Sequence, residues 1–575
     1  MSFLEMVSKL KQILRNSVLI ALTGLVLYLV VVPIILLIWG GFKPGGLLTN
    51  PGFTLSNYIE LYSLSRTYRL ILNTVIFAVG SSFVALFFST LLAWLIERTN
   101  IAFKTWLRTA IIAPMGVPPM LIAMGWVLLG SPKIGFFNLL LKGMFHLSKA
   151  PVNIYSFPGM MFVQGLTLVP GAFMLLCFTF RNMDPVFEDA STVSGVGVFS
   201  TLRRIVLPIL RPALLASAIL TFMISMAVFD IPGIIGLPAR INVLSLQIYL
   251  AVQQPEGIPQ FGIVSSLSSV FFVGIFILSY IYNRQTRMAS KFATITGREF
   301  RPKIIDLRNW RVAAIGFVGV YILLATGLPL AILFWQSLIP YYAPFSLDRL
   351  HLVSWDNYRT ILDYPRVGMA IRNSIIVAVV AATALVFLAT FMSWIIVRSK
   401  YRVRRVLDVV SVLPMALPHI MLGFALVYVY LTLKVGIYGT IWIIVIAYVT
   451  TYITYATRLL NSTMFQIHKE LEEVAQVSGA SLPRIFRTIL MPLLAPSMFG
   501  LWIWVVIYSI RELSAALMLQ SYKSLVLSTL LWHIWERGEI PKVAVIGVGM
   551  VVFLLIIMVL GQVLSRRFEL LTGKR

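Results

Sequence analysis

Long apolar runs, each of about 20 residues, alternate along the chain with short polar intervals. A helix needs about 20 apolar residues to cross the hydrocarbon core of a bilayer. The pattern therefore predicts twelve transmembrane helices, six in each half of the chain. The expected spans lie near residues 17–40, 69–95, 107–130, 159–180, 213–232, 261–282, 312–337, 371–397, 409–432, 440–460, 497–520 and 543–565.

The composition supports a membrane protein, because 59% of the residues are hydrophobic and only 12% are charged. Soluble domains carry about twice that share of charged residues. Inside lipid every backbone polar group needs an internal partner, which helices of this length provide. We therefore expect an all-α polytopic membrane protein. The run from Val18 to Trp39 exceeds the core of a signal peptide, so it is expected to remain as the first span.

The net charge of +26 comes from 47 Lys and Arg against 21 Asp and Glu. With both termini in the cytoplasm, most of these basic residues fall in cytoplasmic segments, as the positive-inside rule requires. The surplus therefore indicates contact with membrane lipid, and no nucleic-acid partner is expected. The single cysteine, Cys177, excludes a disulfide framework, and the five histidines lack metal-ligand spacing. No metal site is predicted.

The first half of the sequence recurs in the second, first at an offset of about 300 and later of about 284. Asn57-Tyr58 returns as Asn357-Tyr358, and Arg98 returns as Arg398. We expect a first repeat at residues 1–283, a basic cytoplasmic linker at 284–310 and a second repeat at 311–575. Six spans are an even number, so the two repeats are expected to run parallel, related by an axis along the membrane normal.

The longest cytoplasmic loop of each repeat, at residues 181–212 and 461–496, carries a shared motif. Acidic residues open a short helix, Ser-Gly follows, and a proline comes 13 residues after the glycine. Acidic residues suit a helix N-terminus and glycine suits a left-handed turn, so the loop is expected to form helix, turn and helix. The alternative is an ordinary amphipathic loop on the membrane surface. An apolar stripe for a partner groove is predicted at Val477, Leu482, Phe486, Ile489 and Leu493.

These two loops resemble the EAA motif of permease subunits of binding-protein-dependent ABC importers, and the similarity covers both halves. The resemblance implies that each loop docks on a cytoplasmic ATPase and couples its closure to the membrane helices. Position by position, it assigns this coupling role to Glu188, Asp189, Ala190, Gly195, Ile205, Leu207 and Pro208 in the first loop. In the second loop the corresponding residues are Glu472, Glu473, Ala475, Gly479, Ile489, Met491 and Pro492.

The resemblance further implies two copies of a separate ABC ATPase, which would use ATP and Mg²⁺, and an external binding protein, periplasmic or lipid-anchored. It implies a bacterial or archaeal cytoplasmic (inner) membrane location. The sequence contains no phosphate-binding loop of the Gly-x-x-x-x-Gly-Lys-Ser/Thr type. We therefore expect no bound cofactor and no enzymatic activity in the chain itself.

Ionisable residues at membrane depth mark possible transport pathways, because an unpaired charge there is costly. Asp230, Arg511 and Glu512 are such residues, and the repeated prolines Pro118 and Pro418 are expected to shape the pathway or act as hinges. The alternative for Arg511 and Glu512 is a structural role, in which they pair with each other or with helix ends. For the prolines it is a tolerated kink.

The segment 511–517 resembles the ferric-iron, thiamine and phosphonate branch of these importers, in which two repeats are commonly fused. Ferric iron is the substrate that this resemblance favours, and phosphonate, thiamine, polyamine and sugar phosphate remain alternatives. An ion-coupled secondary transporter is the competing class, since parallel six-span repeats occur there too. A membrane enzyme lacks support, because no nucleophile, base or metal ligands cluster in the sequence.

Overall fold

A computed structural model of the chain describes residues 3–181, 183, 191, 195, 198–253, 259–292, 304–433 and 435–571. Within these residues the regular elements are helices, and the one β-type contact is an isolated bridge between Thr99 and Ile305. The prediction of an all-α polytopic membrane protein is confirmed.

Ten helical segments are long and apolar enough to cross a membrane. Five belong to each half, and they correspond to the first, second, fourth, fifth and sixth predicted spans. In the first half they lie in α1 (Phe3–Gly41), α3 (Ser65–Arg98), α7 (Phe157–Arg181), α10 (Leu207–Ala227) and α13 (Phe261–Phe292). In the second half they lie in α14 (Trp310–Ile322) with α15 (Leu328–Ser337), α17 (Val367–Arg398), α20 (Ile441–Gln466), α23 (Met491–Arg511) and α26 (Ile540–Leu571).

The third predicted span of each half is broken rather than straight. In the first half α4 (Lys104–Ile112) and α5 (Pro119–Gly130) flank the break, and the segments Lys104–Gly116 and Pro119–Gly130 meet at 97°. In the second, α18 (Val403–Val410) and α19 (His419–Leu433) flank it, and Val403–Met415 and His419–Leu433 meet at 113°. Val117 and Leu417 are extended at the two breaks, as the residue before a proline prefers.

The fifth spans end earlier than the sequence predicted. They cover Arg203–Ala227 and Pro483–Arg511, so residues 228–232 and 512–520 lie beyond them. After each break the chain forms short helices: α11 (Leu237–Ala239) and α12 (Leu244–Val252) in one half, α24 (Ser514–Leu519) and α25 (Leu527–Glu536) in the other. The error arose because these short helices are as apolar as the spans before them.

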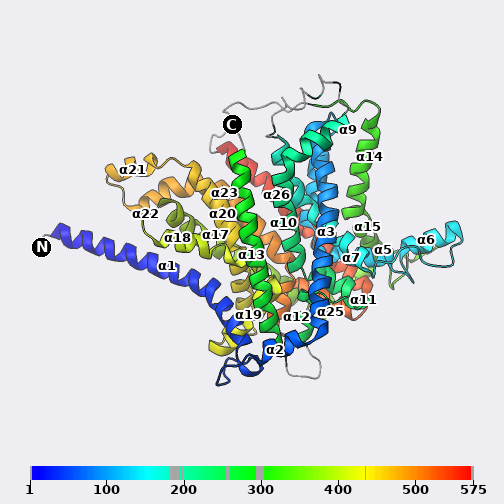
Figure 1. Ribbon diagram of the computed structural model, residues 1–575, viewed down its shortest axis with the longest axis horizontal. Coiled ribbons are helices and arrows are strands. Elements are labelled where there is room, and N and C mark those ends of the chain that lie inside the picture. Colours follow the sequence, from blue (N-terminus) through cyan, green and yellow to red (C-terminus); the bar gives the residue numbers. More distant parts are fainter. Residues whose placement is uncertain are drawn as a thin grey trace.

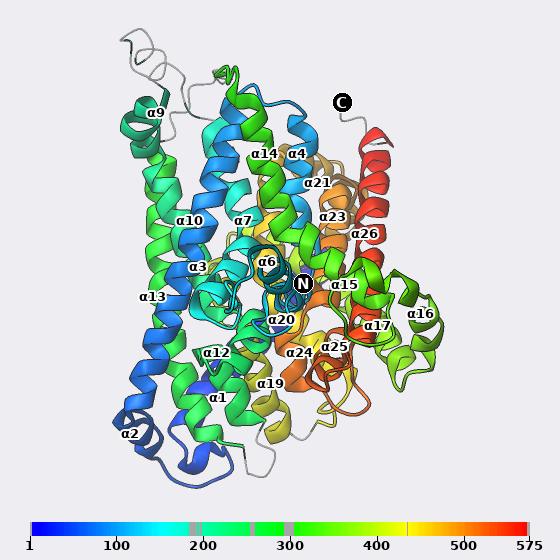
Figure 2. The same ribbon diagram turned by 90° about the vertical axis from the view of Figure 1, so that its right-hand side faces the viewer.

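The first span of each half packs against helices of the other half. Helix α1 packs against α13 of its own half and α19 of the second, and α15 packs against α5 of the first. Gly125 of α5 permits the second contact, because a Cβ there would lie 2.6 Å from the carbonyl oxygen of Pro329. The two halves are therefore interlocked (Figures 1 and 2).

Equivalent polar side chains pin equivalent turns in both halves. Asn57 donates to the carbonyls of Gly41 and Lys43, and Asn357 donates to those of Ser337 and Ile339. These contacts follow the 300-residue offset of the sequence repeat. The domain boundaries at residues 283 and 311 stay a prediction.

The second loop with α21 (Glu470–Val477), and the described part of the first loop with α9 (Val198–Thr201), lie toward one end of the molecule. In Figure 1, α9 and the C-terminus are at the top and α2 (Ser56–Ser63) is at the bottom. We call the end that carries α9 the loop end and the end that carries α2 the opposite end.

Candidate functional site

The second loop forms the predicted helix, turn and helix. Helix α21 begins with three acidic residues, and α22 (Leu482–Ile485) follows a turn at Gly479. Gly479 has φ +82°, a left-handed conformation in which a side chain is strained. The turn is closed by the Ala480 amide, which donates to the carbonyl of Ala475 at 2.9 Å. A glycine is therefore required here by the backbone.

Arg398, at the end of α17, anchors this loop to the membrane helices. Its Nε lies 2.7 Å from Oε1 of Glu472, and its Nη2 donates to the carbonyls of Met464 and Ile467 at 3.3 and 2.6 Å. The side chains of Arg398 and Glu472 are only 11% and 7% exposed. One guanidinium thus joins α17, the end of α20 and the first turn of α21, an arrangement that can transmit movement of the loop to two spans.

The apolar stripe predicted for this loop is partly wrong. Phe486 does not face outward, because it stacks on Phe391 and packs edge-on against Trp394. The apolar side chains that α21 exposes are Leu471, Val474 and Val477, at 47%, 65% and 91% exposure. The predicted stripe assumed one continuous helical spacing across Gly479. In the structure the chain turns there, so the helices before and after the turn present different faces.

Glu473 differs from its neighbour Glu472 because its side chain is exposed, at 54%. Its carboxylate accepts a hydrogen bond from Lys469 at 2.5 Å, and this contact lowers the pKa of Glu473 below its ordinary value. The same contact raises the pKa of Lys469. Of the two acidic residues, Glu472 is thus held by the permease and Glu473 is presented to solvent.

The first loop is described only in part. Glu188, Asp189 and Ala190 lie outside the described residues, whereas Gly195 is exposed and has φ +72°. The ends of the two loops match: Ile205, Leu207 and Pro208 show the same graded exposure as Ile489, Met491 and Pro492, the proline being the exposed member each time. Arg98 donates to the carbonyl of Met183 at 2.9 Å, as Arg398 does to Ile467. The coupling role of these residues remains a prediction.

A second polar site lies where the two halves meet, at the end of the fifth span of the second half. Arg511 is the last residue of α23, and its Nη1 donates to the carbonyl of Met115 in the other half. Its guanidinium carbon lies 4.3 Å from the centre of the Tyr508 ring. Arg511 and Glu512 are not paired with each other, so that part of the structural alternative is wrong. Both do bind the backbone at helix ends, Glu512 at the Ala515 amide in the first turn of α24 and Arg511 at the Met115 carbonyl.

Glu512 is the most heavily bonded acid of this site. Its carboxylate lies 2.9 Å from Nδ1 of His419 and accepts hydrogen bonds from the Tyr452 hydroxyl and the Ala515 amide at 3.2 and 3.3 Å. Its carbonyl accepts from Tyr448 and Ser528. An acid that is only 11% exposed needs such compensation.

Asp230 belongs to the first half and meets the second half directly. It is buried, at 9% exposure, and its Oδ1 accepts a hydrogen bond from Ser514 Oγ at 3.4 Å. The breaks at Pro118 and Pro418 adjoin the same site, because Met115 precedes the first and His419 follows the second. The structure thus brings Asp230, Arg511 and Glu512 together, and the predicted prolines lie close in the chain to Met115 and His419, which contact this site.

A stacked aromatic column leads from this site along α23 toward the loop end. The rings of Tyr455 and Trp504 are 3.9 Å apart and those of Trp504 and Tyr508 are 4.0 Å apart, and the guanidinium of Arg511 lies over the Tyr508 ring. Trp504, Tyr508 and Arg511 follow helical spacing on one face. The column is part-exposed, so it presents ring edges, phenol hydroxyls and one cation.

Several residues of this site are not predicted from the sequence: His419, Tyr448, Tyr452, Ser514 and Ser528. His419 was set aside because no second ligand stood nearby in the sequence, yet its position directly after Pro418 was a usable signal. Tyr448 and Tyr452 are spaced by four residues, which places them on one helix face. Among the described residues no group of three or more His, Cys, Asp or Glu could hold a metal ion.

Comparison with known proteins agrees with the resemblance seen in the loops. Residues 385–570, which include the second loop and Arg511, match the family described as binding-protein-dependent transport system inner membrane component. A putative ferric transport system permease of Haemophilus influenzae is 24% identical over 81% of this chain and 72% of its own length.

Two further relatives broaden the comparison. A ferric transport system permease of Actinobacillus pleuropneumoniae is 25% identical over 78% of this chain and 64% of its own length. A trehalose/maltose transport system permease of Thermococcus litoralis is 26% identical over 40% of this chain and 79% of its own length. The recognition of an importer permease from the two loops is thereby confirmed, and it rests on the family match over residues 385–570 and on the similarity to these permeases.

Proposed function

We propose that this permease carries substrate from an external binding protein across the cytoplasmic membrane, driven by two copies of a separate ABC ATPase at the loop end. The observation that carries the proposal is the second loop. Its first helix exposes Leu471, Val474 and Val477, while Arg398 and Glu472 tie its base to α17 and α20. An exposed apolar helix on a charged anchor suits a groove in a partner that moves.

Substrate is proposed to cross between the halves, past Asp230, Arg511 and Glu512. This position is supported by the contacts that cross the interface there, from Arg511 to Met115 and from Ser514 to Asp230. Pro118 and Pro418 would let the broken third spans change their angle during transport. ATP and Mg²⁺ are assigned to the partner, and both chain termini to the cytoplasm.

Ferric iron is the proposed substrate, because two of the similar permeases carry that name. The buried acids of the interface do not form a metal site, so iron selection is assigned to the external binding protein. Phosphonate, thiamine, polyamine and sugar phosphate remain alternatives within the same transport class.

The ATPase partnership is tested by co-purification from membranes with a Val474→Asp, Val477→Asp double variant. Both side chains are exposed, so the variant is expected to fold normally while losing the co-purified ATPase and its activity. Val435→Asp is the matched control, since Val435 is 57% exposed between α19 and α20. Retention of full ATPase activity by the double variant, or transport that follows an ion gradient without ATP, would overturn the proposal.

The substrate is tested separately by uptake of radioactive Fe³⁺ in cells that lack other ferric importers. Expression of the chain with its partners is expected to confer ATP-dependent iron uptake. If uptake of iron stays at background while uptake of another of the named substrates rises, ferric iron is wrong and the importer assignment stands.

A further inference from the structure

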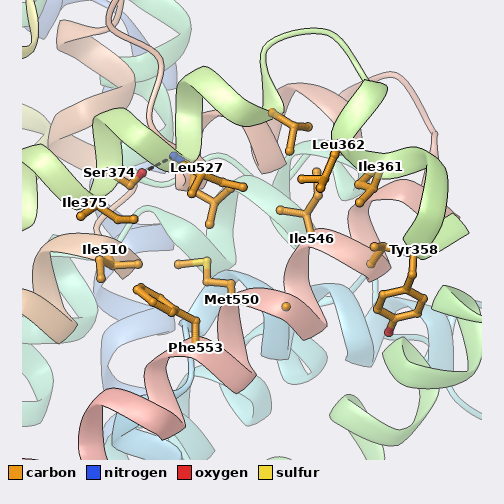
Figure 3. A pocket seen from close by; sticks show the side chains of 14 residues that line it. Tyr358, Ile361, Leu362, Ser374, Ile375, Ile510, Leu527, Ile546, Met550 and Phe553 are labelled. Atoms are coloured by element: carbon orange, nitrogen blue, oxygen red, sulfur yellow. Dashed lines mark hydrogen bonds between the residues drawn. The ribbon is translucent and has the colours of Figure 1, made fainter.

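A groove lies on the second half, between α17, α25, α26 and the short segment formed by α16 (Asp356–Thr360) and Ile361–Asp363. Its volume is about 290 Å³, and it is open on one side (Figure 3). The floor includes Val367, Ile510, Leu527, Ile546 and Met550, all of which are buried. The groove is therefore a shaped cavity with a well-packed base.

The lining offers almost no polar chemistry. Of its side chains only Tyr358 and Ser374 carry polar atoms, and both are engaged within the protein. Ser374 Oγ accepts the Leu527 amide at 2.7 Å (Figure 3). The Tyr358 hydroxyl lies 2.8 Å from Ser337 Oγ. A polar solute would find no free hydrogen-bond partner in this lining, whereas a hydrocarbon chain needs none.

The mouth of the groove faces the lipid. Ile375 and Phe553 stand at its edge with 41% and 38% exposure. The same surfaces of α17 and α26 continue with exposed Val379, Val552 and Ile556. Large apolar side chains exposed along membrane-spanning helices contact acyl chains, so the groove opens into the bilayer.

Basic residues adjoin the lining residues in the chain at the end of the groove away from the loop end. Arg366 precedes α17 and lies 3.7 Å from the centre of the Tyr522 ring, and Lys542 lies 4.5 Å from that of Tyr364. Arg372, beside the lining residue Ile371, is exposed and makes no hydrogen bond or ion pair with any described residue. The position that corresponds to Arg372 in the first half is Leu72. Arginine, lysine and tyrosine at a span end are typical of the headgroup region.

We infer that this groove is a binding site for an anionic phospholipid, with one acyl chain in the groove and the phosphate facing Arg366 and Arg372. The combination of an apolar cavity, an opening to the bilayer and an arginine without a protein partner matches the chemistry of that ligand. The inference is independent of the proposed substrate.

The bound chain would lie behind the interface site. Ile510 on the groove floor precedes Arg511, and Leu527 precedes Ser528, whose hydroxyl donates to the carbonyl of Glu512 at 2.6 Å. An acyl chain against these two residues would hold the ends of α23 and α25 in place. Lipid occupancy is therefore expected to stabilise the turn that carries Arg511 and Glu512.

The test fills the groove from within. Gly549 lines the groove, and a Cβ added there would meet no atom within 4 Å, so Gly549→Leu occupies the space without a clash. Gly274→Leu is the matched control, since Gly274 is equally open on α13 and does not line this groove. The full chain is purified in detergent and mixed with phosphatidylglycerol or phosphatidylcholine. Native mass spectrometry then measures how much of each lipid remains bound.

The wild-type chain and Gly274→Leu are expected to retain phosphatidylglycerol in preference to phosphatidylcholine, and Gly549→Leu is expected to lose the retained lipid. Arg372→Gln, an exposed change that leaves the fold intact, should lower retention about two- to five-fold, the effect of one exposed ionic contact. Arg69→Gln, in the corresponding region of α3, should not. If Gly549→Leu retains as much lipid as the wild type, the inference is wrong. It is also wrong if the wild-type chain forms a dimer that Gly549→Leu abolishes, because a second copy of the chain would then occupy the groove. Equal retention of the two lipids overturns the anionic headgroup.

Discussion

The ends of the two fifth spans have the same backbone and different chemistry. Helices α10 and α23 are both 21 residues long, and each is followed by a break. Ser245 donates to the carbonyl of Val228 at 2.5 Å, and Ser528 donates to that of Glu512 at 2.6 Å. Equivalent serines thus cap equivalent turns, yet Ala227-Val228 in one half corresponds to Arg511-Glu512 in the other.

This comparison shows that the two repeats share their backbone structure at this turn but not the charged residues of the interface site. Charged and aromatic groups are concentrated in the second half, where Trp504, Tyr508 and Arg511 form one face of α23. The first half contributes a single acid, Asp230, whose equivalent position holds its hydrogen-bond partner Ser514. A solute between the halves would therefore meet one wall rich in polar and aromatic groups and one largely aliphatic wall.

Making the second half like the first at this turn is expected to have the largest effect. Glu512→Val copies Val228 and removes the acceptor of His419, Tyr452 and the Ala515 amide. Breaking such a buried pair costs about 3 kcal/mol of unfolding free energy. We expect transport to fall to background, and both quantities are measured, unfolding by SDS titration in mixed micelles.

The control for this change is Val228→Ala, at the equivalent turn of the first half. Val228 offers only a carbonyl to its serine cap, and this remains in the variant. The expected cost is about 1 kcal/mol with transport retained. Equal losses in the two variants would mean that the charges of the second half have no special role.

The next effect concerns the two arginines that anchor the loops. Arg398→Lys is expected to lower ATPase stimulation several-fold, because one ammonium cannot reach Glu472 and both carbonyls as the planar guanidinium does. The loss of unfolding free energy should be about 2 kcal/mol. Arg458→Lys, in an exposed ion pair with Asp408, is the control and should change neither quantity. Unchanged ATPase stimulation in Arg398→Lys would contradict the anchoring role.

The sequence predicted the scaffold better than the site, and the reasons are physical. The positions of the ten long spans and the helix–turn–helix of the second loop follow from local patterns, namely runs of apolar residues and a glycine after an acidic helix. The prolines Pro118 and Pro418 predict a pathway wall, a hinge or a kink, but the local sequence does not specify the 97° and 113° angles of the breaks. Contacts such as His419 with Glu512 join residues 93 positions apart, and nothing in the local pattern around either residue specifies them.

A smaller effect is expected at the glycines of the two loops. Gly195 and Gly479 have φ +72° and +82°, and an added Cβ would touch nothing, so alanine introduces backbone strain alone. Each substitution should cost about 1 kcal/mol and weaken ATPase stimulation moderately. Gly500→Ala is the matched control, because Gly500 is equally open but helical and should be neutral or stabilising. If all three variants behave alike, the left-handed turns are not required.

The smallest effect separates the two neighbouring acids of the second loop. Lys469 lowers the pKa of Glu473, so this pair stabilises the fold above the unfolded-state value of about 4.3 and ceases to do so as pH falls through the lower folded-state pKa. Between pH 6 and 8 its contribution is constant, and solvent exposure keeps it small. We expect no measurable change in unfolding for Glu473→Gln at pH 7, whereas Glu472→Gln should lose about 2 kcal/mol because Arg398 is left with a weaker acceptor. SDS titration of the two variants side by side decides the matter, since equal stability would show that the buried position of Glu472 makes no difference.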